Sequence, residues 1–169
     1  VRPGTSSVVS EIDPGVLEID EQQLGLVTGP AMDVRIEDAR LGLRRLDTGS
    51  RDLVVGDAFG GISVPWHLTT REALADVHRV LRSDGIYAAN LIDFAPLAFA
   101  RAELATMRTV FDHVAVASDA ATLGPWHSRT PSGDGVKRSR SATSSPVDSS
   151  LSIAIGDARR VRSTSSLTT

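Results

Sequence analysis

The sequence predicts an α/β fold: a doubly wound, mostly parallel sheet with helices on both faces. Across residues 7–118, short apolar runs alternate with segments of helical period, and short turns join them. Three of the expected strands also deliver a carboxylate at or near their C-terminal ends, namely Glu11, Asp38 and Asp57. Because the C-terminal ends of parallel strands line one edge of a sheet, where ligands bind, we expect these carboxylates to lie close together there.

The first half of this pattern contains three strands and two helices. Asp13 can cap the first helix, with Pro14 at its first position, where a missing N–H costs nothing, and Gly25 can end it. Asp38 can cap the second helix. Strands are expected at residues 7–12, 34–36 and 53–55. The apolar positions of the helices are Val16, Leu17 and Leu24 in the first, and Leu41, Leu43 and Leu46 in the second.

The second half begins with a loop rich in Gly and Pro, residues 58–68. Thr69 and Glu72 then form a capping box, in which a hydroxyl and a carboxylate satisfy two N–H groups at the start of a helix. That helix is expected to run through Leu81. After it we expect a turn at Asp84 and Gly85, a strand at 86–92, a helix at 96–111 and a strand at 114–117.

The composition changes sharply near residue 120, which predicts a domain at 1–119 and a low-complexity, disordered tail at 120–169. The first part has a net charge of −7, whereas the tail has +4 and contains 12 Ser and 6 Thr among 50 residues. Such a segment buries too little apolar surface to offset the entropy of ordering it, and only residues 151–155 could form a strand. We expect an out-of-frame reading or a comparable replacement of an original C-terminal sequence; the alternative is a natural disordered tail.

Composition also excludes several classes of function. The chain has no Cys, which rules out disulfides and thiolate metal sites, and its four His residues show no metal-ligand spacing. The acidic main body argues against binding a nucleic-acid backbone. No apolar run approaches the roughly 18 residues that span a membrane, and no charged-then-apolar leader opens the chain. We therefore expect a cytoplasmic protein that uses no metal and binds neither nucleic acid nor membrane.

Five sequence blocks, in their order and spacing, resemble the spermidine synthase family, and more closely its shorter bacterial relatives. The blocks are VSEIDP at 9–14, DAR at 38–40, DAF at 57–59, PWHLTTRE at 65–72, and LRSDG at 81–85 with Asn90. The resemblance covers roughly residues 5–118. It implies the Rossmann-like class I methyltransferase fold, with decarboxylated S-adenosylmethionine as the co-substrate that donates an aminopropyl group.

The resemblance also implies roles for particular residues. Glu11 would accept hydrogen bonds from both ribose hydroxyls of the nucleoside, with Asp13 beside it in the same site. Asp38 would hold the adenine amino group while the backbone of Ala39 faces the ring. Asp57 would be the catalytic carboxylate that positions and deprotonates the attacking amine. The alternatives from the residues alone are a solvated loop acid for Glu11, a simple helix cap for Asp38 and a turn residue for Asp57.

Other positions are weaker matches or departures from the family. Phe59, Trp66 and His67 would line the substrate loop, although core packing explains Trp66 and His67 equally well. The family's glycine-rich turn after its first strand is missing, so we expect the sheet to lack its first βα unit. Many polyamine synthases have a second acid three residues after the catalytic Asp, and here that position is Gly60.

Three functions remain open at this point. The first is an aminopropyltransferase, or a fragment of one, that transfers an aminopropyl group from the decarboxylated nucleoside to a small amine. The second is a small-molecule methyltransferase that uses S-adenosylmethionine on the same scaffold, since fold alone does not separate the two. The third is a non-catalytic remnant or nucleoside-binding module. A homo-oligomer is compatible with each.

Overall fold

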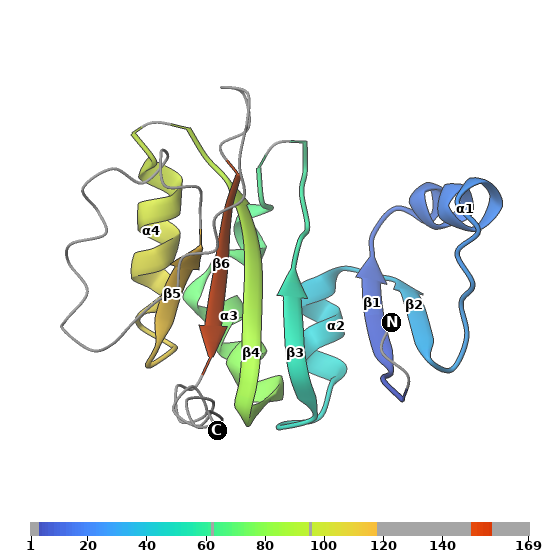
Figure 1. Cartoon of the computed structure of the whole chain (residues 1–169), viewed down its shortest axis with the longest axis horizontal. Helices are drawn as coiled ribbons and strands as arrows, with labels where there is room; N and C mark the ends of the chain where they lie inside the picture. Colours follow the sequence, from blue (N-terminus) through green and yellow to red (C-terminus); the bar gives the residue numbers. More distant parts are fainter. Residues whose placement is uncertain (1–3, 62, 95, 118–149, 157–169) are drawn as a thin grey trace, which may run out of the picture.

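The computed structural model describes residues 4–61, 63–94, 96–117 and 150–156, the last as backbone only (Figure 1). Its elements in chain order are β1 (Ser7–Glu11), α1 (Pro14–Gln23), β2 (Met32–Ile36), α2 (Ala39–Arg45), β3 (Arg51–Gly56), the 3-10 turn η1 (Trp66–Leu68), α3 (Arg71–Val80), β4 (Leu81–Ile92), α4 (Ala98–Met107), β5 (Val114–Ala117) and β6 (Ser150–Gly156). The predicted alternation of strands and helices is confirmed. No described helix is both long enough and apolar enough to cross a membrane.

The strands form two sheets where the sequence predicted one. β1 and β2 pair in parallel, and a second sheet has the strand order β3-β4-β6-β5. β3 and β4 are parallel, and β6 runs against both of its neighbours. Helix α2 lies between β1 and β3 in Figure 1, where the arrows of these two strands point the same way. The parallel strands therefore present their C-terminal ends on one side of the molecule.

The expectation that the tail contributes nothing to the fold is wrong for Ser150–Gly156. This segment pairs with β4 from Ile86↔Gly156 to Ile92↔Ser150, and also with β5, as in Val116↔Ile153. It thus joins residues from both sides of the expected boundary, and the out-of-frame hypothesis for the tail stays a prediction. The sequence Leu-Ser-Ile-Ala-Ile alternates as a strand should, and residues 151–155 are the stretch of the tail where the sequence allowed a strand. The rest of the tail lies outside the described residues.

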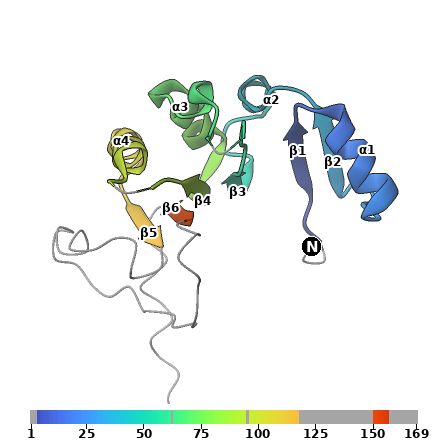
Figure 2. The ribbon, with the colours of Figure 1, turned by 90° about the horizontal axis from the view of Figure 1, so that it is seen from above.

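The hydrophobic core lies between the second sheet and two helices. On β4, alternate residues Tyr87, Ala89 and Leu91 are buried, because one face of the strand packs against helices. Figure 2 shows α2, α3 and α4 along the same side of the strands. No described helix covers the opposite face of β3 and β4. The residues of that face include the exposed Leu53, Val55 and Ile86.

Some helix boundaries differ from those predicted. The N-cap of α3 is Thr70, whose hydroxyl accepts the N–H of Ala73, and the expected cap Thr69 instead donates to the carbonyl of Trp66. Thr69 completes the η1 turn, so the helix starts one residue later than the capping box predicted. Helix α4 is also shorter than expected at both ends.

Helix α1 has the predicted cap but not the predicted packing. Asp13 accepts the N–H of Gly15, Pro14 occupies the first turn, and Gly25 follows the helix with a φ of +72°. However, no residue of α1 is buried, and Val16 and Leu24 are exposed. The described part of the chain places its buried apolar residues between 73 and 111, so α1 adds little to the core.

Candidate functional site

The three predicted carboxylates follow strands that run in the same direction. Glu11 is the last residue of β1, Asp38 follows β2 by two residues, and Asp57 comes directly after β3. Since β2 is parallel to β1, and β1 and β3 point the same way in Figure 1, all three emerge at C-terminal strand ends. The strands point the same way, as the sequence predicted, although they belong to two sheets; that the three carboxylates lie close together stays a prediction.

Glu11 is held in place by the start of helix α1. Its Oε1 accepts the N–H of Asp13 at 2.8 Å, and Asp13 in turn caps the helix through Gly15. The second carboxylate oxygen of Glu11 takes no hydrogen bond from the described residues. Glu11 is half-buried and borders a hollow between α1 and the β1–β2 pair. The other lining residues are Val9, Val16, Leu17, Asp20, Leu26, Met32 and Val34, most of them apolar.

Glu37 connects β1 to α2, a role that the sequence did not suggest. Its Oε1 accepts the hydroxyl of Ser10 at 3.1 Å, and its other oxygen forms an ion pair with Arg45. A Cβ at Gly42 would lie 2.5 Å from the same Oε1, so a larger residue there would displace the carboxylate of Glu37. The backbone N–H of Glu37 also bonds to the carbonyl of Glu11 at 2.9 Å. Glu37 thus joins the end of β1 to helix α2.

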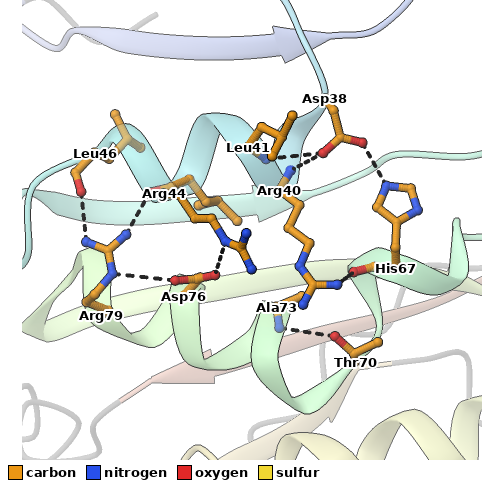
Figure 3. Close-up of polar contacts among 11 residues, drawn as sticks. Asp38, Arg40, Leu41, Arg44, Leu46, His67, Thr70, Ala73, Asp76 and Arg79 are labelled. Atoms are coloured by element: carbon orange, nitrogen blue, oxygen red, sulfur yellow. Dashed lines mark hydrogen bonds and ion pairs between the residues drawn. The ribbon is translucent and has the colours of Figure 1, made fainter.

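Asp38 uses both carboxylate oxygens, and so does more than the simple helix cap allowed by the sequence. Its Oδ1 accepts the N–H groups of Arg40 and Leu41, and its Oδ2 lies 2.9 Å from Nε2 of His67 (Figure 3). Burial acts to raise the pKa of Asp38, but the hydrogen bonds from Leu41 and His67 outweigh it and hold the pKa below its usual value. The carboxylate is therefore kept ionised. Ala39, the predicted base contact, is the first residue of α2.

The η1 turn brings the loop after Asp57 to the start of α2. His67 meets Asp38 through its ring, and Nη1 of Arg40 donates to the carbonyl of His67 at 3.1 Å. Trp66 is 77% exposed, so core packing does not explain it, and its ring meets that of His67 edge-on at 5.9 Å. Phe59 is half-buried in the same loop. Of Phe59, Trp66 and His67, His67 alone forms a described hydrogen bond with a predicted nucleoside-binding residue, Asp38.

Asp57 is exposed at the end of β3 and has one side-chain partner in the described structure. Nδ2 of Asn90 donates to its Oδ1 at 2.9 Å, which leaves Oδ2 available to a ligand. Asn90 belongs to the sequence pattern quoted above, but no role followed from it. Gly56, the residue before Asp57, is also required: a Cβ there would lie 2.5 Å from the hydroxyl of Tyr87. The described residues contain no group of three potential metal ligands.

No protein-family model matches the chain. Over 111 residues it is 34% identical to a polyamine aminopropyltransferase of Vibrio vulnificus, a match covering 64% of this chain and 36% of that protein. Among solved structures, it resembles a probable spermidine synthase from Corynebacterium glutamicum, with 27% identity, a TM-score of 0.70, and coverage of 91% of this chain and 48% of that one.

Two further structures share the fold. Human methyltransferase-like protein 13, in complex with SAH, has 19% identity and a TM-score of 0.65, covering 99% of this chain and 66% of that one. A spermidine synthase in complex with the transition state analogue AdoDATO has 16% identity and a TM-score of 0.63, covering 89% and 46%. The chain spans about a third of the curated relative and half of the spermidine synthases. The chain therefore has the class I methyltransferase fold, and over part of their length it resembles the polyamine aminopropyltransferase and the probable spermidine synthase.

Proposed function

We propose that this chain binds a nucleoside of the S-adenosylmethionine type and supplies the carboxylates for aminopropyl transfer to a small amine. The observation that carries the proposal is the placement of Glu11, Asp38 and Asp57 at the C-terminal ends of strands that run the same way. The similarity to a polyamine aminopropyltransferase supports the choice of reaction.

The nucleoside would be bound by the residues around α1 and α2. Glu11 would accept the ribose hydroxyls, because its second oxygen is available and the N–H of Asp13 fixes the first. Asp38 would accept the adenine amino group, and its low pKa keeps it an acceptor. Ala39 begins α2 directly beside this carboxylate, where its backbone would face the ring. A homo-oligomer stays a prediction.

The chemical step would take place at Asp57. The nitrogen of the acceptor amine attacks the methylene carbon bonded to the sulfonium sulfur of the decarboxylated nucleoside. The C–S bond breaks, its electron pair goes to sulfur, and methylthioadenosine leaves as a neutral thioether. The proton lost by the nitrogen passes to Oδ2 of Asp57 and then to water. Asn90 would hold the carboxylate in the orientation that this transfer needs.

A methyltransferase is the second candidate, because the fold is shared with human methyltransferase-like protein 13. Gly60 also favours a methyltransferase. Many polyamine synthases have a second acid at this position, so here a diamine would meet one carboxylate instead of two. The two reactions differ in the co-substrate: S-adenosylmethionine keeps a carboxyl group that the aminopropyl donor has lost.

Calorimetry on the full chain with methylthioadenosine, S-adenosylmethionine and decarboxylated S-adenosylmethionine tests these proposals. Binding of all three, tightest for the decarboxylated form, is the result expected of an aminopropyltransferase. Preference for S-adenosylmethionine would favour the methyltransferase, and binding of methylthioadenosine alone would favour a nucleoside-binding module. If none of the three binds, the proposed function is wrong.

A further inference from the structure

Asp38 has almost exhausted its capacity to accept hydrogen bonds. A carboxylate offers about four lone-pair positions. Two are used on Oδ1, by the N–H groups of Arg40 and Leu41, and one on Oδ2, by His67. The one position left is therefore on Oδ2, the oxygen that His67 already holds. Because a carboxylate only accepts, Nε2 of His67 carries the proton of this hydrogen bond.

A second contact fixes His67 through its backbone. Nη1 of Arg40 donates to the carbonyl of His67, so both the ring and the backbone of this residue are tied to the first turn of α2 (Figure 3). The side chains of Asp38 and His67 are only about a quarter to a third exposed, which limits competition from water.

We infer that His67 is a positioning residue that couples the base-binding oxygen of Asp38 to the η1 turn. This inference rests on the proposed nucleoside site. An amino group bound to the last free position of Oδ2 lies against the imidazole, so it cannot bind without sensing the orientation of η1. In return, a bound base holds η1 in place. Occupancy of the nucleoside site and the orientation of η1 are thus linked.

Trp66 provides a spectroscopic reporter of this coupling. It is largely exposed, and its ring meets the His67 ring edge-on, so a change at His67 alters its surroundings. The chain contains two tryptophans, and the variant W126F leaves Trp66 as the only one. In this background, methylthioadenosine is expected to shift or quench the emission of Trp66 as the site fills.

Three variants made in the W126F background separate coupling from simple loss of structure. H67A removes the hydrogen bond, and H67Q keeps an N–H donor near the position of Nε2. H113A removes an exposed histidine that lies between α4 and β5 and serves as the matched control. H67A is expected to lose the emission response and to bind methylthioadenosine on the order of threefold to tenfold more weakly. H67Q and H113A are expected to keep the response.

The possible results are distinct. Binding of methylthioadenosine without any emission change in W126F overturns the inference, even if no His67 variant folds. A response of full size in H67A overturns it too, and so does loss of the response in both H67A and H67Q. No binding by W126F and by the unmodified chain would instead reject the proposed function, and the inference with it. Circular dichroism of each variant checks that the fold is retained.

Discussion

At the residue scale, the most unusual side chain outside the candidate site is Glu103. It lies on α4 between core residues and is only 4% exposed. Burial raises its pKa to about 7, and the pKa of the nearby Tyr87 rises to about 12, first through burial and then through the charge of Glu103. No sequence pattern indicated this burial, because a Glu beside Leu104 also fits the border of an amphipathic helix.

We predict that Glu103 makes the protein less stable as the pH rises. Its folded pKa lies above the value of 4.5 expected in the unfolded chain, so the folded state binds the proton more tightly. The free energy of unfolding should therefore fall between about pH 4.5 and 7, by roughly 3 kcal/mol at most. E103Q should be more stable than the unmodified protein at pH 8 and nearly equal to it at pH 5. Urea unfolding at both values measures this, and an identical pH dependence in the two proteins would contradict it.

A second prediction separates the two halves of the candidate site. E11Q should weaken the binding of methylthioadenosine by roughly 1.5–3 kcal/mol, because a charged acceptor for the ribose hydroxyls is lost. D57N should leave that affinity nearly unchanged and lower turnover on the order of 10²- to 10⁴-fold, because the base is removed. Calorimetry and an assay of methylthioadenosine release report the two effects. Equal loss of affinity in both variants would reject this division of roles.

The sequence predicted where these carboxylates lie, but not which residues hold them. A carboxylate at a strand end follows from local pattern, and so does the cap at Asp38. The partners come from far along the chain: His67 is 29 residues from Asp38, and Asn90 is 33 residues from Asp57. Such contacts depend on how the strands are ordered and paired, and no local pattern contains that information.

At the scale of elements, α2 depends on contacts at both of its ends. The His67 contact holds its start, and Arg79 of α3 binds its end by donating to the carbonyls of Leu43 and Leu46, each at 2.8 Å (Figure 3). These carbonyls lie at the C-terminal end of the helix, where few backbone N–H groups remain as partners; that of Leu43 also accepts the N–H of Leu46. Arg44 and Asp76 add an ion pair between the two helices. Helix α2 is thereby fixed to the second sheet.

Replacing Arg79 should therefore destabilise α2. R79A removes two hydrogen bonds from a charged donor, and we expect a loss of about 2–3 kcal/mol in the free energy of unfolding. R71A, at an exposed position in the first turn of α3, is the matched control and should lower the free energy of unfolding much less. Denaturant titration of both variants gives the comparison. A loss in R71A equal to that in R79A would show that the contact with α2 contributes nothing.

At the scale of the whole molecule, the described core is unevenly distributed. The buried apolar residues belong to α3, β4, α4 and the turn after it, whereas β1, α1 and β2 contain none. The order of elements was predictable because each has its own periodicity. The division into two sheets was not, because strand pairing joins residues far apart in the chain. It follows that the elements around Glu11 are held less firmly than those around Asp57.

β6 should be essential to the sheet that contains Asp57, because it pairs with β4 over seven residue pairs and with β5 over four. A chain ending at residue 149 would leave β4 and β5 with open edges facing each other, and the free energy of unfolding should drop sharply or the protein should aggregate. A chain ending at residue 156 keeps β6 and is the matched control. Hydrogen exchange on the full chain should find slow amides in β6, comparable with those of β4. If the shorter chain unfolds as cooperatively and at the same denaturant concentration as the longer one, β6 is dispensable, and the hypothesis that the tail lies outside the fold regains its place.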